Sequence, residues 1–246
     1  MNTHLNRKRC LSRARGGDYV HPGEEEAIDI VMRKFPKDSA RKILDVGCGL
    51  GGTAAYIKNH GFGTPVCIDR EDDCIEYVNE SYPELETYAC DVMDLNQIFQ
   101  PEQFDLAYLF SSFYAFPDQQ NSLKVIADLV KSKGELFIFD YATKSEYTGP
   151  HLFSRDRNGF TPLRLDNIGQ LLSNAGWHLE EMIDMSTDYI RWYEKLITNL
   201  ANKKHTLINE IGQDTFDVIY HNFNNLLTYL NSGEILGYTI YAKKST

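Results

Sequence analysis

Residues 42–53, KILDVGCGLGGT, form an apolar run that breaks into a glycine-rich turn and then opens a helix. Glycines permit a tight bend and remove the Cβ atoms that would keep a ligand away from the backbone. The N–H groups in the first turn of the following helix then remain available to a polar ligand. Gly47, Gly49 and Gly52 have the spacing G-x-G-x-x-G, which a nicotinamide dinucleotide would also fit, and a turn without any ligand is a third interpretation.

Asp45, two residues before the first of these glycines, separates the interpretations. A fold that must accept a pyrophosphate usually has apolar residues there, because an acid repels phosphate. The sequence of residues 45–52, DVGCGLGG, resembles the first motif of class I S-adenosylmethionine-dependent methyltransferases. The resemblance implies that Asp45 hydrogen-bonds the methionyl part of S-adenosylmethionine.

Apolar runs alternate with helical patterns along the rest of the chain. Because five expected strands alternate with helices, we predict an α/β fold with a doubly wound, Rossmann-like sheet of seven strands. In the class that the glycine motif resembles, the last of the seven strands is antiparallel. The strands are expected at residues 41–46, 65–69, 87–90, 104–110, 135–140, 177–185 and 234–243.

Acidic residues follow the second and third expected strands. Asp69 ends the second strand, where a carboxylate can accept hydrogen bonds from both hydroxyls of a ribose. The ribose of NAD could bind Asp69 equally well, so Asp69 indicates nucleoside binding but does not distinguish between the two cofactors. Asp91 follows the third strand and is placed to meet an adenine amino group, with a turn or helix-cap aspartate as the alternative. The predicted cofactor-binding residues are Tyr19, Asp45, Gly47, Cys48, Gly49, Gly51, Asp69, Arg70, Asp91, Val92 and Leu109.

Composition limits the class of partner and the compartment. The 246 residues carry 25 basic and 35 acidic side chains, and a net charge of -10 disfavours nucleic acid and suits a small neutral or cationic substrate. The five cysteines are scattered without a C-x-x-C pair, which favours reduced thiols and a cytoplasmic protein. No apolar run is long enough for a membrane span and no metal-ligand spacing occurs, so we expect no membrane, no metal, and a monomer or homodimer.

The two ends of the chain suggest segments outside the sheet. Residues 1–17 contain basic side chains and no acid, which favours a mobile tail or a segment that orders over the cofactor. Two apolar helical patterns within 187–231 precede the last strand. We therefore divide the chain into a basic, cofactor-covering segment at 1–22 and a methyltransferase domain at 23–246. Within that domain, 186–233 form a helical lid inserted between strands six and seven.

A longer resemblance is to the phosphoethanolamine N-methyltransferases. Residues 18–23, DYVHPG, resemble the N-terminal tyrosine-serine-glycine stretch of that family, and residues 139–143, FDYAT, resemble its fifth-strand exit. The family implies a tyrosine-lined pocket for a small amine, with an acid and a histidine after the fourth strand. Ser111 and Ala115 stand at those two positions here, so the family's base is missing.

The part of that family's site that holds the phosphate is also altered. The sequence around residues 158–160 lacks the expected arginine and tyrosine, although Arg155, Arg157 and Arg164 lie nearby. The phosphobase specificity is therefore not carried over to this chain.

Aromatic residues after the fourth and fifth strands and in the inserted helices are the candidates for the acceptor site. Aromatic faces tolerate positive charge on an amine or a sulfonium, whereas ordinary packing is the alternative for the helix residues. His21 could act as a base or contact the cofactor carboxylate, or it could do neither as a helix-entry residue. The predicted catalytic residues are Tyr114, Tyr141 and His21, and the predicted substrate-binding residues are Tyr114, Tyr141, Tyr189 and Trp192, with Tyr193 a further candidate in the apolar register.

The sequence therefore predicts an S-adenosylmethionine-dependent methyltransferase that acts on a small molecule, specifically a small amine by N-methylation. A neutral amine needs no strong base, because placing its lone pair behind the methyl carbon is the main requirement. Two alternatives remain open, a nicotinamide-dependent oxidoreductase and an S-adenosylmethionine-binding protein without catalysis.

Overall fold

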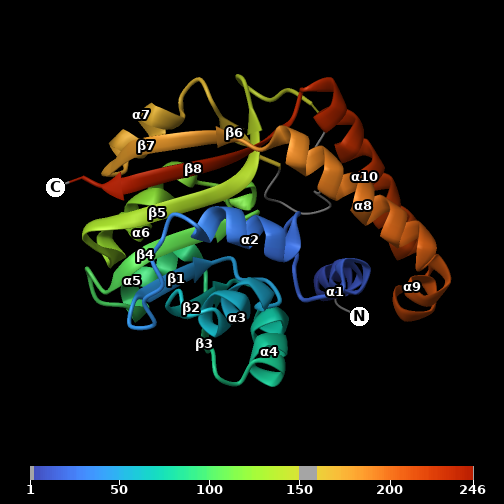
Figure 1. Cartoon of the computed structure of the whole chain (residues 1–246), viewed down its shortest axis with the longest axis horizontal. Helices are drawn as coiled ribbons and strands as arrows, with labels where there is room; N and C mark the ends of the chain where they lie inside the picture. Colours follow the sequence, from blue (N-terminus) through green and yellow to red (C-terminus); the bar gives the residue numbers. More distant parts are fainter. Residues whose placement is uncertain (1–2, 150–159, 246) are drawn as a thin grey trace.

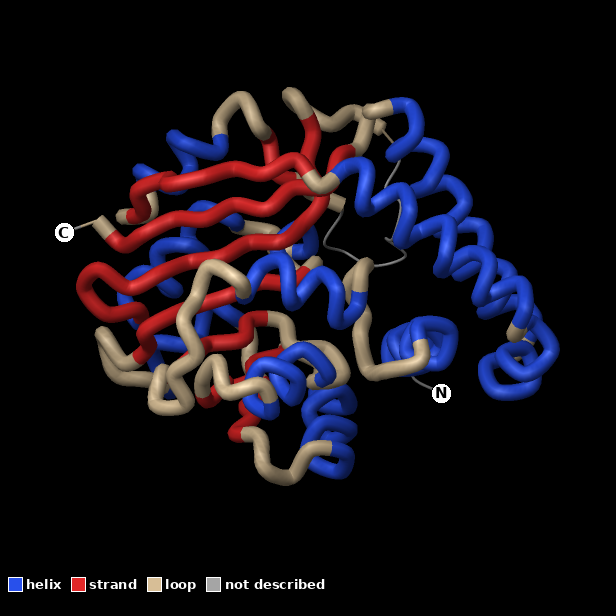
Figure 2. The backbone as a smooth tube through the Cα atoms, in the orientation of Figure 1, coloured by secondary structure: helices blue, strands red, loops and turns tan. Residues whose placement is uncertain are grey.

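The computed structural model describes residues 3–149 and 160–245, which form a mixed sheet flanked by helices (Figures 1 and 2). The strand order is β3-β2-β1-β4-β5-β8-β7, and β6 pairs with β5 off this path. β8 runs antiparallel to β5 and β7, whereas the other neighbours are parallel. The predicted doubly wound sheet with an antiparallel last strand is confirmed. The strands are β1 (Lys42–Val46), β2 (Thr64–Asp69), β3 (Glu86–Ala89), β4 (Phe104–Phe110), β5 (Val130–Thr143), β6 (Leu163–Arg164), β7 (Trp177–Asp184) and β8 (Leu236–Lys244).

Helices cover both faces of this sheet, and the central strands are apolar on both sides for that reason. In β4, Tyr108 and Phe110 belong to one hydrophobic cluster, whereas Ala107 and Leu109 belong to the cluster on the opposite face. The helices are α1 (Thr3–Arg15), α2 (Glu24–Met32), α3 (Gly52–Asn59), α4 (Asp72–Ser81), α5 (Leu95–Ile98), α6 (Gln119–Leu129), α7 (Ile168–Asn174), α8 (Ser186–Asn202), α9 (Lys204–Ile211) and α10 (Gln213–Ser232), with short 3₁₀ turns η1 (Val92–Asp94) and η2 (Phe113–Ala115). None of the helices among the described residues could cross a membrane.

The insertion between β7 and β8 consists of three helices, where the sequence pattern indicated two. α8 and α10 pack side by side and project beyond the sheet, and α9 connects their far ends (Figure 1). α9 was missed because Leu207 is its one buried residue, so the segment has no apolar stripe. Gly212, at φ +82, separates α9 from α10.

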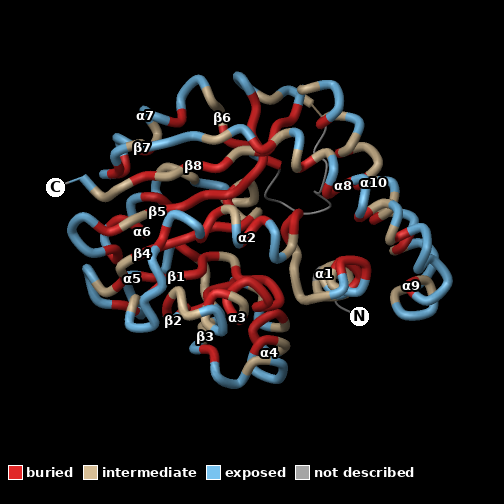
Figure 3. The backbone as a smooth tube through the Cα atoms, in the orientation of Figure 1, coloured by how far each residue is buried: buried red, intermediate tan, exposed pale blue. Residues whose placement is uncertain are grey.

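The expectation of a mobile N-terminal tail is corrected by α1. This helix packs on α8, α9 and α10, and its buried residues Cys10, Leu11 and Ala14 are almost fully covered (Figure 3). The tail was misjudged because these three residues form a short apolar face only when the inserted helices lie against it.

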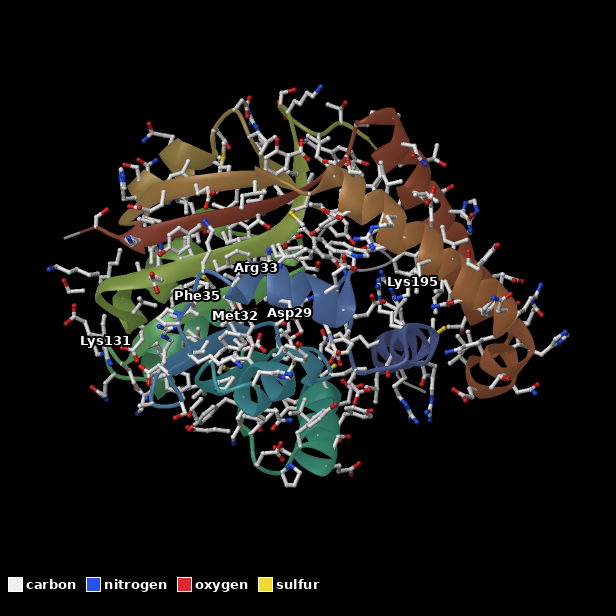
Figure 4. The ribbon with its side chains drawn as sticks, in the orientation of Figure 1. Asp29, Met32, Arg33, Phe35, Lys131 and Lys195 are labelled. Atoms are coloured by element: carbon white, nitrogen blue, oxygen red, sulfur yellow. The ribbon has the colours of Figure 1, made fainter. Side chains whose placement is uncertain are left out.

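α2 ties α1 and the insertion to the body of the protein. Met32 at the end of α2 and Phe35 just after it are buried in the cluster against β4 and β5, and Figure 4 labels both near the C-terminal end of α2. At the other end of α2, Glu24 accepts a hydrogen bond from Arg15 of α1 at 3.0 Å and lies 3.7 Å from the Lys195 ammonium of α8. Glu24 therefore joins α1, α2 and α8.

Candidate functional site

A cavity of about 240 Å³ lies where the carboxyl ends of the parallel strands meet. This is the usual place for a ligand in an open α/β sheet. Its walls come from the glycine turn after β1, the ends of β2 and β3, the loop after β4, and α1, α8 and α10. We call the part around Asp69 and Asp91 the nucleoside end, and the part around Tyr114, Tyr141, Tyr193 and Phe223 the acceptor end.

The glycine turn is fixed to the neighbouring strand by backbone hydrogen bonds. The N–H groups of Gly47 and Cys48 both donate to the Ile68 carbonyl, at 2.7 and 2.9 Å. Gly47 has φ +86, and a Cβ atom there would lie 2.5 Å from the Ser112 side chain. Glycine is thus required at 47 because the loop after β4 packs directly on the turn, a tertiary contact that the motif alone does not reveal.

Asp69 at the end of β2 accepts hydrogen bonds with both carboxylate oxygens. Its Oδ2 accepts from Gly49 N at 2.9 Å and from Lys8 Nζ at 3.2 Å, and its Oδ1 accepts from Glu71 N at 3.1 Å. Lys8 also donates to Cys74 Sγ at 3.1 Å. Burial is the largest single effect and lowers the pKa of Lys8, but the charges and hydrogen bonds of Asp69 and Cys74 together outweigh it, so the pKa lies above its ordinary value. Apart from the basic character of its segment, no sequence pattern points to Lys8.

Replacing Lys8 with methionine is expected to tighten the binding of S-adenosylhomocysteine about fivefold. Lys8 and a ribose would compete for the same carboxylate, and a partly exposed ion pair is worth up to about 1 kcal/mol. Arg9→Met is the matched control, because it removes the same charge from an exposed position of α1. Calorimetric titration of both variants measures the effect, and equal affinities for wild type and Lys8→Met would contradict it.

Asp45 lies in the cavity wall and is held by β4. The Tyr108 hydroxyl donates to Asp45 Oδ2 at 2.8 Å, and both residues are almost completely buried. Burial raises the pKa of Asp45 to about 8, the Tyr108 bond opposes the rise and the Asp69 charge adds to it. At pH 7 this carboxyl is therefore mostly protonated and can donate as well as accept a hydrogen bond.

Four aromatic side chains from four separate elements build the acceptor end. The Tyr141 hydroxyl on β5 is hydrogen-bonded to the Tyr193 hydroxyl on α8, and the Tyr193 ring stacks on Phe223 of α10 with centroids 5.7 Å apart. The Tyr114 ring lies 5.3 Å from the Tyr141 ring in an edge-to-face arrangement. Burial raises the pKa of Tyr193 to about 12 and that of Tyr141 well above the ordinary value, so these phenols stay protonated at neutral pH.

His21 lines the cavity, but both of its ring nitrogens are occupied. Nδ1 is 2.9 Å from the Pro22 carbonyl oxygen, which can only accept, so Nδ1 carries the proton. Nε2 therefore accepts from the Thr53 hydroxyl, also at 2.9 Å. Burial lowers the pKa of His21 to about 3, against the Pro22 bond and with help from the Arg15 charge. This arrangement argues against the expected role of His21 as a base.

The cavity brings together most of the residues that the sequence selected. Tyr193 lines it in place of Tyr189 and Trp192, whose face on α8 could not be distinguished by spacing alone. Arg7, Lys8, Leu11 and Phe223 were not selected, because they lie on helices whose docking the sequence does not specify. The selected residues in the wall are His21, Asp45, Gly47, Cys48, Gly49, Asp69, Arg70, Asp91, Val92, Tyr114 and Tyr141.

The other five selected residues lie outside the cavity wall, for different reasons. The Tyr19 hydroxyl donates to Glu25, and Trp192 Nε1 donates to Glu26. Tyr189 is fully buried against Phe139. Leu109 faces the opposite hydrophobic cluster, and Gly51 caps α3.

Ser111 and Ala115, which stand where the phosphoethanolamine N-methyltransferases have an acid and a histidine, both line the cavity. Among the described residues, no other acid or histidine takes the place of that pair at the acceptor end. Arg164 pairs with Asp166 at 2.9 Å on the surface, and Arg155 and Arg157 lie outside the described residues.

Comparison with known proteins places this site in a family. A model of the methyltransferase domain matches residues 19–224. Phosphoethanolamine N-methyltransferase of Triticum aestivum is 23% identical over 235 residues, covering 92% of this chain and 45% of the relative. Phosphoethanolamine N-methyltransferase 1 of Zea mays is 24% identical over 230 residues, covering 89% and 44%. The chain thus spans about half the length of these curated relatives.

Solved structures share the fold. Phosphoethanolamine N-methyltransferase 2 of Haemonchus contortus, in complex with phosphomonomethylethanolamine and S-adenosylhomocysteine, superimposes with a TM-score of 0.81 at 17% identity, over 96% of this chain and 56% of that chain. The [4+2]-cyclase SpnF superimposes with a TM-score of 0.82 at 17% identity, over 99% and 94%.

The chain belongs to the methyltransferase domain family and has the fold of the class I S-adenosylmethionine-dependent methyltransferases. The residues present fit S-adenosylmethionine, because Asp45 near the end of β1, Asp69 at the end of β2 and Asp91 after β3 line one cavity, where their carboxyl groups can accept hydrogen bonds from hydroxyl and amino groups. The nicotinamide alternative is therefore set aside.

Proposed function

We propose that this protein transfers a methyl group from S-adenosylmethionine to a small amine that binds in its neutral form. The observation that carries the proposal is an acceptor end made of aromatic side chains without an available base among its described residues. Tyr141 and Tyr193 keep their protons, and His21 is engaged through both nitrogens. A neutral amine already has the lone pair that attack requires, whereas a hydroxyl acceptor would need to lose a proton to a base.

The residues of the chain would divide the work between the two ends of the cavity. Asp69 and Asp91 would hold the nucleoside, and Asp45 would hold the methionyl group. When bound, S-adenosylmethionine supplies an electrophilic methyl carbon for in-line displacement. Tyr114, Tyr141 and Tyr193 would orient the amine, and their ring faces would stabilise the positive charge that develops on nitrogen, by about 0.5 to 2 kcal/mol for each well-placed ring.

The inserted helices and the N-terminal segment would act together as a cover. Tyr193 and Phe223 of the insertion and Leu11 of α1 contribute to the cavity wall, so opening this side would expose the acceptor end. We propose that residues 1–22 and 186–233 form this cover over the methyltransferase domain, and that it excludes water during transfer.

The relatives support an amine acceptor, since several of them are named phosphoethanolamine N-methyltransferases. Ser111 and Ala115 stand where that family has an acid and a histidine, and this difference favours the alternative of S-adenosylmethionine binding without methyl transfer. An acceptor screen separates the two possibilities. The purified protein is incubated with S-adenosylmethionine and a panel of primary, secondary and tertiary amines, phosphobases included, and methylated products are identified by mass spectrometry.

A methylated amine is the expected product, and its rate of formation should rise with pH as the fraction of neutral amine increases. S-adenosylhomocysteine binding without any methylated amine would favour the non-catalytic alternative. Methylation of hydroxyl acceptors alone would contradict the choice of nitrogen.

Tyr141→Phe is expected to lower kcat about tenfold and leave S-adenosylhomocysteine affinity unchanged. The change removes one hydroxyl and its bond to Tyr193 at the acceptor end. In the proposed reaction this hydroxyl would hydrogen-bond the amine nitrogen as positive charge develops on it, and one hydrogen bond to a charged group is worth about 1.5 kcal/mol or more. Tyr88→Phe is the control, because the Tyr88 hydroxyl bonds to Glu86 on the exposed surface. Unchanged turnover of the identified acceptor would refute the role of Tyr141.

A further inference from the structure

Asp140 is a fully buried carboxylate next to the acceptor end that the proposed reaction does not use. Its Oδ2 accepts from Tyr114 N at 3.1 Å, and its Oδ1 accepts from Tyr141 N at 2.7 Å. The N–H groups of Ser112 and Phe113 also act on this carboxylate. One acid of β5 thus receives the N–H groups of the loop that follows β4.

That loop, residues 111–116, lines the cavity but has little structure of its own. Its 3₁₀ turn η2 begins after Ser112, whose side chain does not cap the turn. The Ser112 hydroxyl instead donates to the Val46 carbonyl at 2.7 Å. Ser111 adopts φ +50, which is unfavourable for a residue with a Cβ atom and persists only where the surroundings enforce it. The N–H groups at the start of the turn therefore depend on a partner from another element, which is Asp140.

We propose that Asp140 is a positioning residue for the acceptor end: its carboxylate holds the backbone of residues 112–114 and so keeps the Tyr114 ring in the cavity wall. This role of Asp140 rests on the proposed function in one respect, namely that Tyr114 contacts the acceptor. The hydrogen bond from Tyr114 N to Asp140 does not depend on which acceptor the protein uses.

The charge state of Asp140 makes this role sensitive to pH. Burial raises the pKa of Asp140 to about 7, although the N–H bonds act to lower it. Protonation converts one acceptor oxygen into a donor, so the hold on the loop weakens as pH falls through 7. Among the described residues, the Asp140 charge acts on the phenols of Tyr114 in the loop and Tyr189 on α8, and burial raises the pKa of both. These groups stay neutral in this range, so the titration belongs to the carboxyl.

Asp140→Asn tests the proposal by amide hydrogen exchange, without any acceptor. The asparagine keeps one oxygen but turns its NH₂ group toward N–H donors, so protection of the segment 112–116 should fall about tenfold or more. Asp118→Asn is the matched control, because exposed Asp118 likewise accepts from a backbone N–H, that of Asn121 at 3.0 Å, at the start of α6. The control should leave the segment 112–116 unchanged.

The pH series on wild type gives a second, independent readout. Protection factors of the segment 112–116 should decrease as pH falls from 8 to 6 and should lack this dependence in Asp140→Asn. Global stability changes in the opposite direction, because an aspartate whose folded pKa is raised costs stability as pH rises toward that pKa. The wild-type series also serves if Asp140→Asn does not fold.

Unchanged protection of the segment in Asp140→Asn, an equal loss of protection throughout the chain, or a pH-independent segment in wild type would overturn the proposal. S-adenosylhomocysteine affinity should stay within about threefold of wild type, because Asp140 lies away from the nucleoside end. Once an acceptor is known, Asp140→Asn should raise its KM. Failure of the acceptor screen would leave the exchange results intact, so the two proposals fail separately.

Discussion

Asp69→Ala is expected to weaken S-adenosylhomocysteine binding at least about a hundredfold. In the proposed site Asp69 would accept from two ribose hydroxyls, and hydrogen bonds to a charged group contribute about 1.5 to 3 kcal/mol each. Since about 1.4 kcal/mol is a tenfold change in Kd, the loss of two such bonds exceeds a hundredfold. Isothermal titration calorimetry measures the change directly.

The environment of Asp69 determines the controls for this variant. Removing the carboxylate leaves the Lys8 ammonium without its partner, so the double variant Lys8→Met, Asp69→Ala separates lost recognition from the effect of an unpaired charge. Asp72→Ala removes an exposed acid from the first turn of α4 and should bind normally. Binding within about threefold of wild type by a folded Asp69→Ala protein would reject the nucleoside end as assigned.

Gly237→Ala is expected to lower the free energy of unfolding by about 1 to 3 kcal/mol, or more. A Cβ atom at residue 237 of β8 would lie 2.2 Å from the Tyr189 ring, and that ring is fully buried against Phe139 with centroids 5.0 Å apart. The Tyr189 ring must therefore move, and it lies 6.3 Å, centroid to centroid, from the Tyr193 ring at the acceptor end. Thermal unfolding should show a lower Tm, by about 2 to 4 °C per kcal/mol for a chain of this size.

A matched glycine and a double-mutant cycle test this cause. Gly169→Ala lies on exposed α7, where the added Cβ would meet only Leu179 at 3.9 Å, and better helix propensity should leave stability unchanged or raise it. Tyr189→Ala removes the obstructing ring, so adding Gly237→Ala to it should cost much less than in wild type. An undiminished cost in the Tyr189→Ala background would show that the strain lies elsewhere.

The contrast between Asp69 and Lys8 shows how far the sequence could predict the site. Asp69 was selected because local patterns place it at the end of a buried strand, and parallel strands end at one edge of the sheet. Lys8 reaches the same carboxylate from a helix 61 residues away in the chain, and no local pattern encodes that distance. The same difference separates Tyr193, which lines the cavity, from Tyr189, which is one turn earlier on α8 and does not.

The sequence by itself determined the alternation of the first five sheet strands with helices, the glycine turn, and the acids at or just beyond the ends of β1, β2 and β3, because alternation of apolar runs and turn residues acts over a few neighbouring positions. Only the tertiary structure decided that residues 3–15 form a helix, that Lys8 pairs with Asp69, and that Asp140 holds the loop bearing Tyr114. These features depend on how separate elements dock, which follows from packing and charge pairing between residues far apart in the chain. The nucleoside end was therefore accessible to sequence reasoning, whereas the acceptor end required the fold.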